Sequence, residues 1–349
     1  MSRAEVTRDG LKNVRPGREA QSWAQGYGWQ RGEGRRRKRK RRDQPTSYYG
    51  KPIINPPVWA ELDIAGYLFA GGLAGASSIL ASGADFTGRP RLARRSKVCA
   101  SGAISVSLLA LIHDLGRSAR FLNMLRVFKP TSPMSVGVWI LFFYGPLCFA
   151  SAASDVLGVA PRTGKALGAG AGVIGAGVAS YTAALIADTA VPAWHEAHRE
   201  LPFLFVGSAA SAGGGFGLLA APLRENAPAR RMAALGAAGE LIAEQLMERR
   251  LGIVAATLHE GKAGRRMRAA KALTLAGALG AATLARRHRG AAVLSGAALV
   301  AGSALTRFGI FAAGMASAED PKYTVQPQRQ RLAERQARAP VVSPGDTGG

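Results

Sequence analysis

The sequence predicts an all-α, polytopic membrane protein. Two observations support this prediction: six long stretches are nearly free of charged residues, and a basic run at residues 35–42 precedes the first of them. Each stretch reaches the roughly 17–25 residues that a helix needs to cross about 30 Å of hydrocarbon. Since lipid offers no partner for backbone N–H and C=O groups, each should form an α-helix, whereas barrel strands would be shorter and alternating. The six stretches are residues 62–82, 98–116, 134–154, 166–187, 201–223 and 290–315.

Two weaker segments bring the predicted number to eight transmembrane helices. Residues 230–247 contain Glu240 and Glu244, and residues 269–285 hold Lys271 near one end, where its side chain could reach the headgroups. The overall composition conceals these segments. The net charge of +24 and the mean hydropathy of +0.04 describe the whole chain, in which two charged tails offset an apolar middle. Eight helices are therefore expected, and six are the lower bound.

The two ends of the chain have the composition of disordered tails. Residues 1–57 are rich in Arg, Gly, Gln and Glu, and residues 319–349 resemble them; such segments bury too little apolar surface to offset chain entropy. No apolar h-region leads to a cleavage site, so the first span is expected to stay in the mature protein. The basic run lacks neighbouring aromatics for stacking on bases. We therefore expect it to attract anionic membrane lipids, by about 1 kcal/mol per basic residue, and not to bind nucleic acid.

A weak internal repeat points to two halves of the membrane region. Residues 68–72 (LFAGG) resemble residues 204–208 (LFVGS), and a tract of small residues follows each. The match is compatible with two four-helix halves in the same orientation, residues 58–200 and 201–318, although composition alone could generate it. The small residues mark helix contacts, since helix association in lipid relies on close van der Waals packing.

The loop charges predict the orientation in the membrane. With eight spans, both termini lie on the same face as the loops 117–133, 188–200 and 248–268, and this face also has the basic run at residues 35–42. Lys and Arg accumulate on the cytoplasmic side of membrane proteins. We therefore expect cytoplasmic termini in the plasma membrane of a prokaryote, although arginines at residues 89–95 also mark the opposite face.

The chain is not expected to carry a redox centre of its own. Its two cysteines, Cys99 and Cys148, lie in different predicted spans without CxxC spacing, which leaves no iron–sulfur or zinc site. Among the histidines only His113 falls near the interior of a span, so no bound haem is expected. His195 and His198 have acidic neighbours, and we favour a solvated loop there over a metal site.

Ionisable groups inside the spans are the best functional candidates, because burying them in hydrocarbon is costly. Asp63 and Tyr67 are four residues apart and share one face of the first helix. Residues 113–117 (HDLGR) close the second helix at the interface where the first begins, so the two clusters could meet. Asp114 and Arg117 could instead pair with each other or cap the helix. The full set is Asp63, Tyr67, His113, Asp114, Tyr144, Tyr181, Asp188, Glu240, Glu244 and Arg307.

Three of these acids are candidates for a second proton path. If the halves are equivalent, Glu240 and Glu244 occupy in the sixth helix the place of His113 and Asp114 in the second. The alternative is a weakly amphipathic helix that lies at the membrane surface. Asp188 ends the fourth span and joins the path or simply marks the span boundary.

Three motifs resemble the NrfD/polysulfide reductase membrane-anchor family. They are residues 67–75 (YLFAGGLAG), residues 114–117 (DLGR) and residues 132–139 (SPMSVGVW). The strong motifs cover residues 57–145, whereas residues 224–315 match by hydropathy alone. The chain departs from the family at Ser118, where a proline is common.

The resemblance implies an anchor subunit that docks an iron–sulfur (4Fe-4S) electron-transfer subunit, together with a molybdopterin or tungstopterin catalytic subunit. It further implies exchange of electrons and protons with menaquinone or ubiquinone, and formate is the expected substrate of the catalytic partner. The expected quinone-binding residues are Asp63, Tyr67, His113, Asp114 and Arg117.

A secondary transporter or channel remains open as the alternative function. Intramembrane carboxylates and paired halves are also typical of transporters. Broken helices at the midplane would favour transport, yet residues such as Pro130, Pro133, Pro192 and Pro202 lie where spans begin.

Overall fold

The computed structural model describes residues 5–7, 10–12, 53–115 and 123–338. The chain divides into two compact units, residues 1–55 and 56–349. In the first unit, strands β1 (Glu5–Thr7) and β2 (Gly10–Lys12) form an antiparallel pair with Glu5 opposite Lys12. The basic run at residues 35–42 lies outside the described residues.

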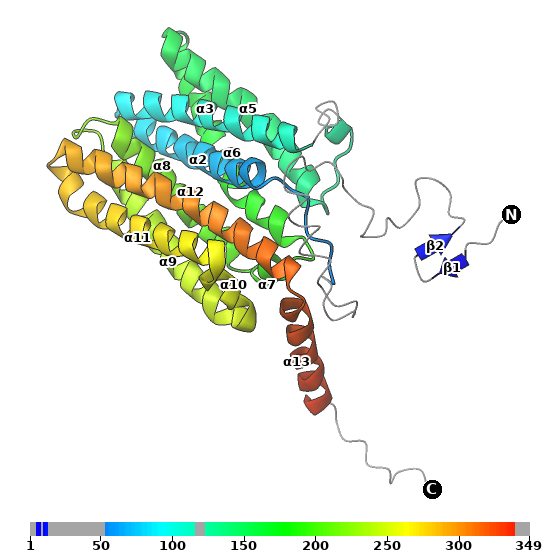
Figure 1. Ribbon diagram of the computed structural model, residues 1–349. Helices are drawn as coiled ribbons and strands as arrows, with labels where there is room; N and C mark the ends of the chain where they lie inside the picture. Colours follow the sequence, from blue (N-terminus) through cyan, green and yellow to red (C-terminus); the bar gives the residue numbers. More distant parts are fainter. Residues whose placement is uncertain (1–4, 8–9, 13–52, 116–122, 339–349) are drawn as a thin grey trace, which may run out of the picture. The chain divides into compact units, whose positions relative to one another are not determined.

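The second unit is helical throughout its described regular structure (Figure 1). Eight long helices are described between residues 61 and 319: α2 (Glu61–Phe86), α3 (Pro90–Asp114), α5 (Pro133–Leu157), α6 (Pro161–Ala187), α8 (Leu201–Ala220), α9 (Ala227–Leu251), α11 (Gly261–Ala282) and α12 (Arg289–Glu319). Short helices α7 (Pro192–Glu196) and α10 (Ala256–His259) lie in the connections, with 3₁₀ turns η2 (Gly252–Ala255) and η3 (Leu284–Arg286).

Six of the described helices are long and apolar enough to cross a membrane: α2, α3, α5, α6, α8 and α12. These are the six clear spans that the sequence predicts, so the all-α, polytopic class is confirmed. The two weaker segments also form helices, α9 and α11, but both carry several charged residues and fall outside the six. The expected total of eight transmembrane helices therefore stays a prediction.

The packing order of the first four long helices recurs in the last four. Helix α2 packs against α3 and α6, and α5 packs against α6; likewise α8 packs against α9 and α12, and α11 packs against α12. Helices α2 and α8 pack against each other, and each also contacts the final helix of the other set (Figure 1).

Glycines allow the closest of these helix approaches. A Cβ atom on Gly75 of α2 would overlap the carbonyl oxygen of Gly175 on α6, and a Cβ on Gly296 of α12 would overlap that of Gly215 on α8. The first and last helices of each set therefore approach each other backbone to backbone. Small residues permit this geometry, which side chains of ordinary size would exclude.

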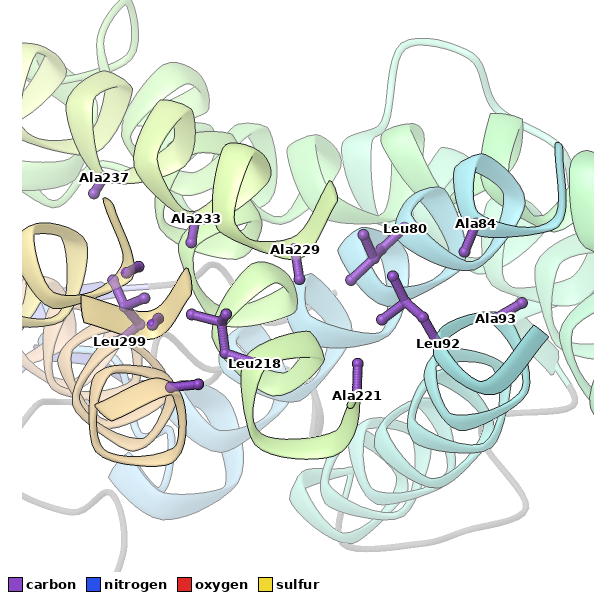
Figure 2. Close-up of a cluster of buried hydrophobic side chains, with 13 residues drawn as sticks. Leu80, Ala84, Leu92, Ala93, Leu218, Ala221, Ala229, Ala233, Ala237 and Leu299 are labelled. Atoms are coloured by element: carbon purple, nitrogen blue, oxygen red, sulfur yellow. The ribbon is translucent and has the colours of Figure 1, made fainter. Parts of the chain in front are cut away.

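Alanine and leucine side chains from helices α2, α3, α8, α9, α11 and α12 form one buried cluster (Figure 2). Leu80 of α2 and Leu92 of α3 lie next to each other, and Leu218 of α8 belongs to the same buried cluster. The other members are mostly alanines, including Ala229, Ala233 and Ala237 of α9 and Ala292 of α12. Because alanine adds little bulk, the helices pack tightly around this cluster.

The helical unit has a near end and a far end, and connections between helices lie at each. The near end holds the start of α2, the end of α3 and the connections at residues 123–132, 188–200 and 252–260. The far end holds the connections at residues 87–89, 158–160, 221–226 and 283–288.

The last described helix, α13 (Lys322–Arg338), lies in the segment that the sequence predicted to be a disordered tail. The structure describes residues 322–338 as helical, and the expectation of a disordered tail stays a prediction. The segment is rich in Gln and Arg, which are good helix formers even where they bury little surface. Residues 339–349 lie outside the described residues.

Candidate functional site

An acid–base pair joins the first two spans at the near end. Nδ1 of His113, in the last turn of α3, lies 2.8 Å from Oδ2 of Asp63, in the first turn of α2. The Asp63 side chain is 18% exposed and that of His113 is 80% exposed. The Asp63 carboxylate is therefore largely shielded from solvent, whereas most of the His113 imidazole surface is exposed.

Asp114 joins the same two helices by a second contact. The backbone N–H of Ala60, just before α2, donates to Oδ1 of Asp114 at 3.2 Å. The structure thus brings together the two clusters that the sequence placed at one interface. Gly116 and Arg117, the second half of the DLGR motif, lie outside the described residues, so the alternative pairing of Asp114 with Arg117 stays open.

Tyr67 makes its side-chain contacts deeper in the bundle. Its hydroxyl bonds to the hydroxyl of Tyr181 on α6, and the two rings meet edge to face at 6.5 Å between centroids. Ser107 of α3 donates to the backbone oxygen of Tyr67 at 3.1 Å. Tyr67 lies one helical turn from Asp63, and it makes no hydrogen bond to Asp63 or His113 among the described residues.

The SPMSVGVW motif shapes the connection next to this site. Ser132 caps α5 by accepting a hydrogen bond from the N–H of Ser135, and Pro133 begins the helix. The Ser135 hydroxyl donates to the backbone oxygen of Val127 and tightens the preceding turn. A Cβ on Gly137 would overlap the Tyr181 ring, so this glycine leaves room for the tyrosine that bonds Tyr67.

Aromatic and ionic contacts fix the start of α2 to the second set of helices. Trp59 stacks on Trp194 with ring centroids 5.9 Å apart, and the Trp194 indole N–H donates to the backbone oxygen of Ile310 at 2.9 Å. Glu61 forms ion pairs with Lys262 and Arg266 of α11. These contacts therefore fix the start of α2, the helix that carries Asp63.

A second polar cluster lies within the later helices. Glu240 of α9 accepts a hydrogen bond from the Thr306 hydroxyl at 2.7 Å. Arg307 is fully buried, donates to the backbone oxygen of Phe205 at 2.7 Å and lies 3.8 Å above the Phe205 ring. One oxygen of Glu240 and two nitrogens of Arg307 are buried without a hydrogen-bond partner among the described residues.

The remaining candidates of the proton path differ in their surroundings. Glu244 is buried and interacts electrostatically with Lys271 of α11. Both Glu240 and Glu244 are buried against neighbouring helices, and whether α9 crosses the membrane or lies at its surface stays open. Asp188 is exposed at the end of α6, so the structure does not bring it into contact with either glutamate.

The sequence reasoning missed a buried charge cluster at the far end. Nζ of Lys97 lies 2.7 Å from Asp85 and 2.8 Å from Asp155, and the lysine side chain is 3% exposed. All three residues fall just outside the predicted spans 62–82, 98–116 and 134–154. The helices that carry them extend beyond these spans; α3, for example, begins at Pro90 and not near residue 98. Opposite charges that flank three spans at the same end were the signal that could have identified the cluster.

Two pockets lie on the helical unit away from the Asp63–His113 pair. A pocket of about 530 Å³ lies between α3 and α5, and it is lined mainly by apolar residues such as Val98, Phe149 and Leu157. A second pocket of about 510 Å³ lies at the far end. Neither is lined by Asp63 or His113. Within the described ranges, no three His, Cys, Asp or Glu residues are grouped so that they could hold a metal ion.

Comparison with known families connects this geometry to other proteins. The model of the family described as polysulphide reductase, NrfD, matches residues 52–241, from the approach to α2 into α9. Among curated proteins, none matches the sequence. The family match covers residues 57–145, where the three motifs lie, and confirms the resemblance. Because this model matches more than half of the chain, the chain belongs to the polysulphide reductase NrfD family.

Proposed function

We propose that the chain is the integral membrane subunit of a respiratory oxidoreductase complex and exchanges electrons and protons with the quinone pool. Membership of the polysulphide reductase NrfD family supports the class of complex. The Asp63–His113 pair at the end of two spans is the observation that carries the quinone site. An acid and a base in contact at a membrane interface can take up or release the protons that accompany electron transfer.

The donor set at the near end fits a quinone oxygen. Quinol oxidation releases two protons with two electrons, and the quinone supplies this redox chemistry. Asp63 orients the imidazole of His113 through Nδ1, and Nε2 has no hydrogen-bond partner among the described residues. Nε2 can therefore donate to a quinone oxygen or accept its proton, while Asp63 stabilises the imidazolium that results.

The other candidate residues have supporting roles in this proposal. Asp114 holds the start of α2 against the end of α3 through the Ala60 N–H, which keeps Asp63 and His113 within reach of each other. Tyr67 and Tyr181 form the inner wall of the site, one turn deeper in the bundle. Arg117 would add a fixed positive charge at the same interface.

We assign Glu240 and Glu244 to a second proton path, with Asp188 at its near-end opening. Support comes from the burial of both glutamates and from the unpartnered oxygen of Glu240, which an ordered water could satisfy. Glu240 and Glu244 are four residues apart on α9, so their side chains follow one face of the helix.

The partners in this proposal follow from the family. An iron–sulfur (4Fe-4S) subunit docks on the membrane subunit and connects it to a molybdopterin or tungstopterin catalytic subunit, with formate as its substrate. We place the complex in the plasma membrane of a prokaryote, with eight crossings and cytoplasmic termini. Menaquinone and ubiquinone both fit the donor set.

The proposal is tested by quinone-linked electron transfer in membranes that contain the native complex. Asp63→Asn keeps the shape of the side chain but removes the proton acceptor, and His113→Gln removes the titrating group. Each should lower the quinone-linked rate about 100-fold or more, because positioned acid–base groups contribute about 10²–10⁴-fold. The amount of membrane-inserted protein is measured in parallel, so that a folding defect is recognised.

Glu260→Gln serves as the matched control, since Glu260 is an exposed acid of the near end without a side-chain hydrogen bond in the structure. Its rate should stay within about two-fold of the parent. Rates within two-fold for both Asp63→Asn and His113→Gln would remove the pair from the mechanism and overturn the proposed site.

A further inference from the structure

A pocket surrounded by arginines lies at the far end, away from the Asp63–His113 pair. Its volume is about 510 Å³. It lies where the start of α3, the connection between α8 and α9 and the first residue of α12 come together. Its lining consists of four arginines and two apolar residues: Arg91, Arg95, Pro222, Leu223, Arg224 and Arg289.

Two of these arginines are fixed by the end of α8. Arg289 donates to the backbone oxygens of Leu218 at 2.7 Å and Ala221 at 2.6 Å, and also to that of Leu219. Arg95 donates to the backbone oxygen of Ala220. These bonds satisfy carbonyl groups that a helix leaves free at its C-terminus. They hold both guanidinium groups in place, and neither group forms an ion pair with a carboxylate among the described residues.

The other two arginines have no such partners. Arg91 and Arg224 are exposed, and neither has a hydrogen bond or ion pair among the described residues. The nearest acid along the chain is Glu225, whose Oε2 accepts the backbone N–H of Leu92 at 2.9 Å. Glu225 is not among the described residues that line the pocket, so the four guanidinium groups leave an excess of positive charge there, and this repulsion is relieved when an anion binds.

The position of the pocket indicates the kind of anion. It lies at the ends of α3, α8 and α12, which are candidate membrane spans, so it is at the level of the lipid headgroups. Guanidinium groups match the geometry of phosphate oxygens through paired hydrogen bonds. Pro222 and Leu223 offer apolar contact beside them, which suits a phosphate attached to acyl chains.

We propose that this arginine pocket binds the phosphate group of an anionic phospholipid. Arg95 and Arg289 form the fixed wall, and Arg91 and Arg224 close on the headgroup from the outer side. The shared chemistry is that of a phosphate, which inorganic phosphate also has; the apolar wall and the headgroup level favour the lipid. The site is separate from the quinone site and does not depend on the proposed function.

The experiment titrates the full chain in detergent with phosphatidylglycerol, with phosphatidylcholine and with inorganic phosphate, and follows bound ligand by native mass spectrometry. The parent should bind phosphatidylglycerol at least ten-fold more tightly than either of the other two probes. Arg91→Gln combined with Arg224→Gln should weaken this binding about 30-fold, since each basic residue near an anionic headgroup contributes about one kcal/mol.

Arg94→Gln combined with Arg162→Gln is the matched control, because both arginines are exposed at the same end and do not line the pocket. It should bind phosphatidylglycerol within about two-fold of the parent. Thermal unfolding checks the fold of both double variants, which remove no hydrogen bond of the structure. Unchanged lipid binding in the Arg91/Arg224 variant would overturn the proposal. Equal affinity for inorganic phosphate or for phosphatidylcholine would overturn it as well.

Discussion

At the scale of single residues, Lys97 is a charged side chain that is buried in the bundle. It is buried at the far end, and its ammonium group contacts carboxylates from α2 and α5, Asp85 and Asp155. Removing one partner from a buried ionic cluster leaves uncompensated charge in a medium that solvates it poorly. The cluster therefore makes the positions of three helices depend on one side chain.

Replacing this lysine gives the first stability prediction. Lys97→Met should lower the free energy of unfolding by about 3–5 kcal/mol, because it leaves Asp85 and Asp155 unpaired. Thermal unfolding in detergent measures the change. Lys165→Met, an exposed lysine of the same end, should have little effect. Adding Asp85→Asn and Asp155→Asn should recover most of the loss, and equal unfolding of Lys97→Met and Lys165→Met would contradict this prediction.

The residues that the sequence could and could not identify differ in their position along the spans. Asp63 and His113 were predictable as neighbours, because the first helix begins at the interface where the second ends. Lys97 was missed since hydropathy places the start of a span where charge disappears, whereas the helix itself begins at Pro90. Tyr181 was among the candidate residues inside the spans, but its contact with Tyr67 depends on how α2 and α6 pack.

At the scale of helices, glycine contacts determine how closely the long helices approach. Gly75 on α2 faces Gly175 on α6, and Gly215 on α8 faces Gly296 on α12, each at backbone distance. The sequence predicted helix contacts from tracts of small residues. It could not say which glycine meets which, because the register between two helices is a property of the packed structure.

This contact gives a prediction for the α2–α6 crossing. A Cβ atom in Gly75→Ala would overlap the backbone oxygen of Gly175, which cannot rotate away, so the two helices must separate. The expected loss of stability is about 1–3 kcal/mol. Thermal unfolding in detergent is again the measurement.

Gly66→Ala is the control in the same helix, since a Cβ there meets nothing within 4 Å. It should leave stability unchanged or raise it slightly, because alanine favours helix over glycine. Equal effects of the two substitutions would show that the α2–α6 crossing is not held at the glycine pair.

At the scale of the whole molecule, the repeated packing order and the charges of α9 and α11 bear on the number of crossings. Both helices pack with spans of the second set, as α3 and α5 do with spans of the first. Their charged residues, however, lower their hydropathy below that of the six candidate spans. Sequence reasoning located all eight long helices, and the crossing of the membrane by α9 and α11 stays a prediction.

Orientation also remains a prediction at this scale. The near end was expected to face the cytoplasm on account of its basic loops and the run at residues 35–42, which lies outside the described residues. The exposed arginines around the proposed lipid pocket favour, by the same rule, a cytoplasmic location of the far end. Anionic lipid bound in that pocket would neutralise part of this competing charge.

The most direct test of the account is isolation of the native complex through an affinity tag on this chain, followed by iron analysis and titration with quinone analogues. The account predicts that an iron–sulfur subunit co-elutes and that a menaquinone or ubiquinone analogue binds, with binding weakened about ten-fold or more by His113→Gln. A purified chain that has no iron-containing companion and leaves both analogues unbound would contradict the central claim.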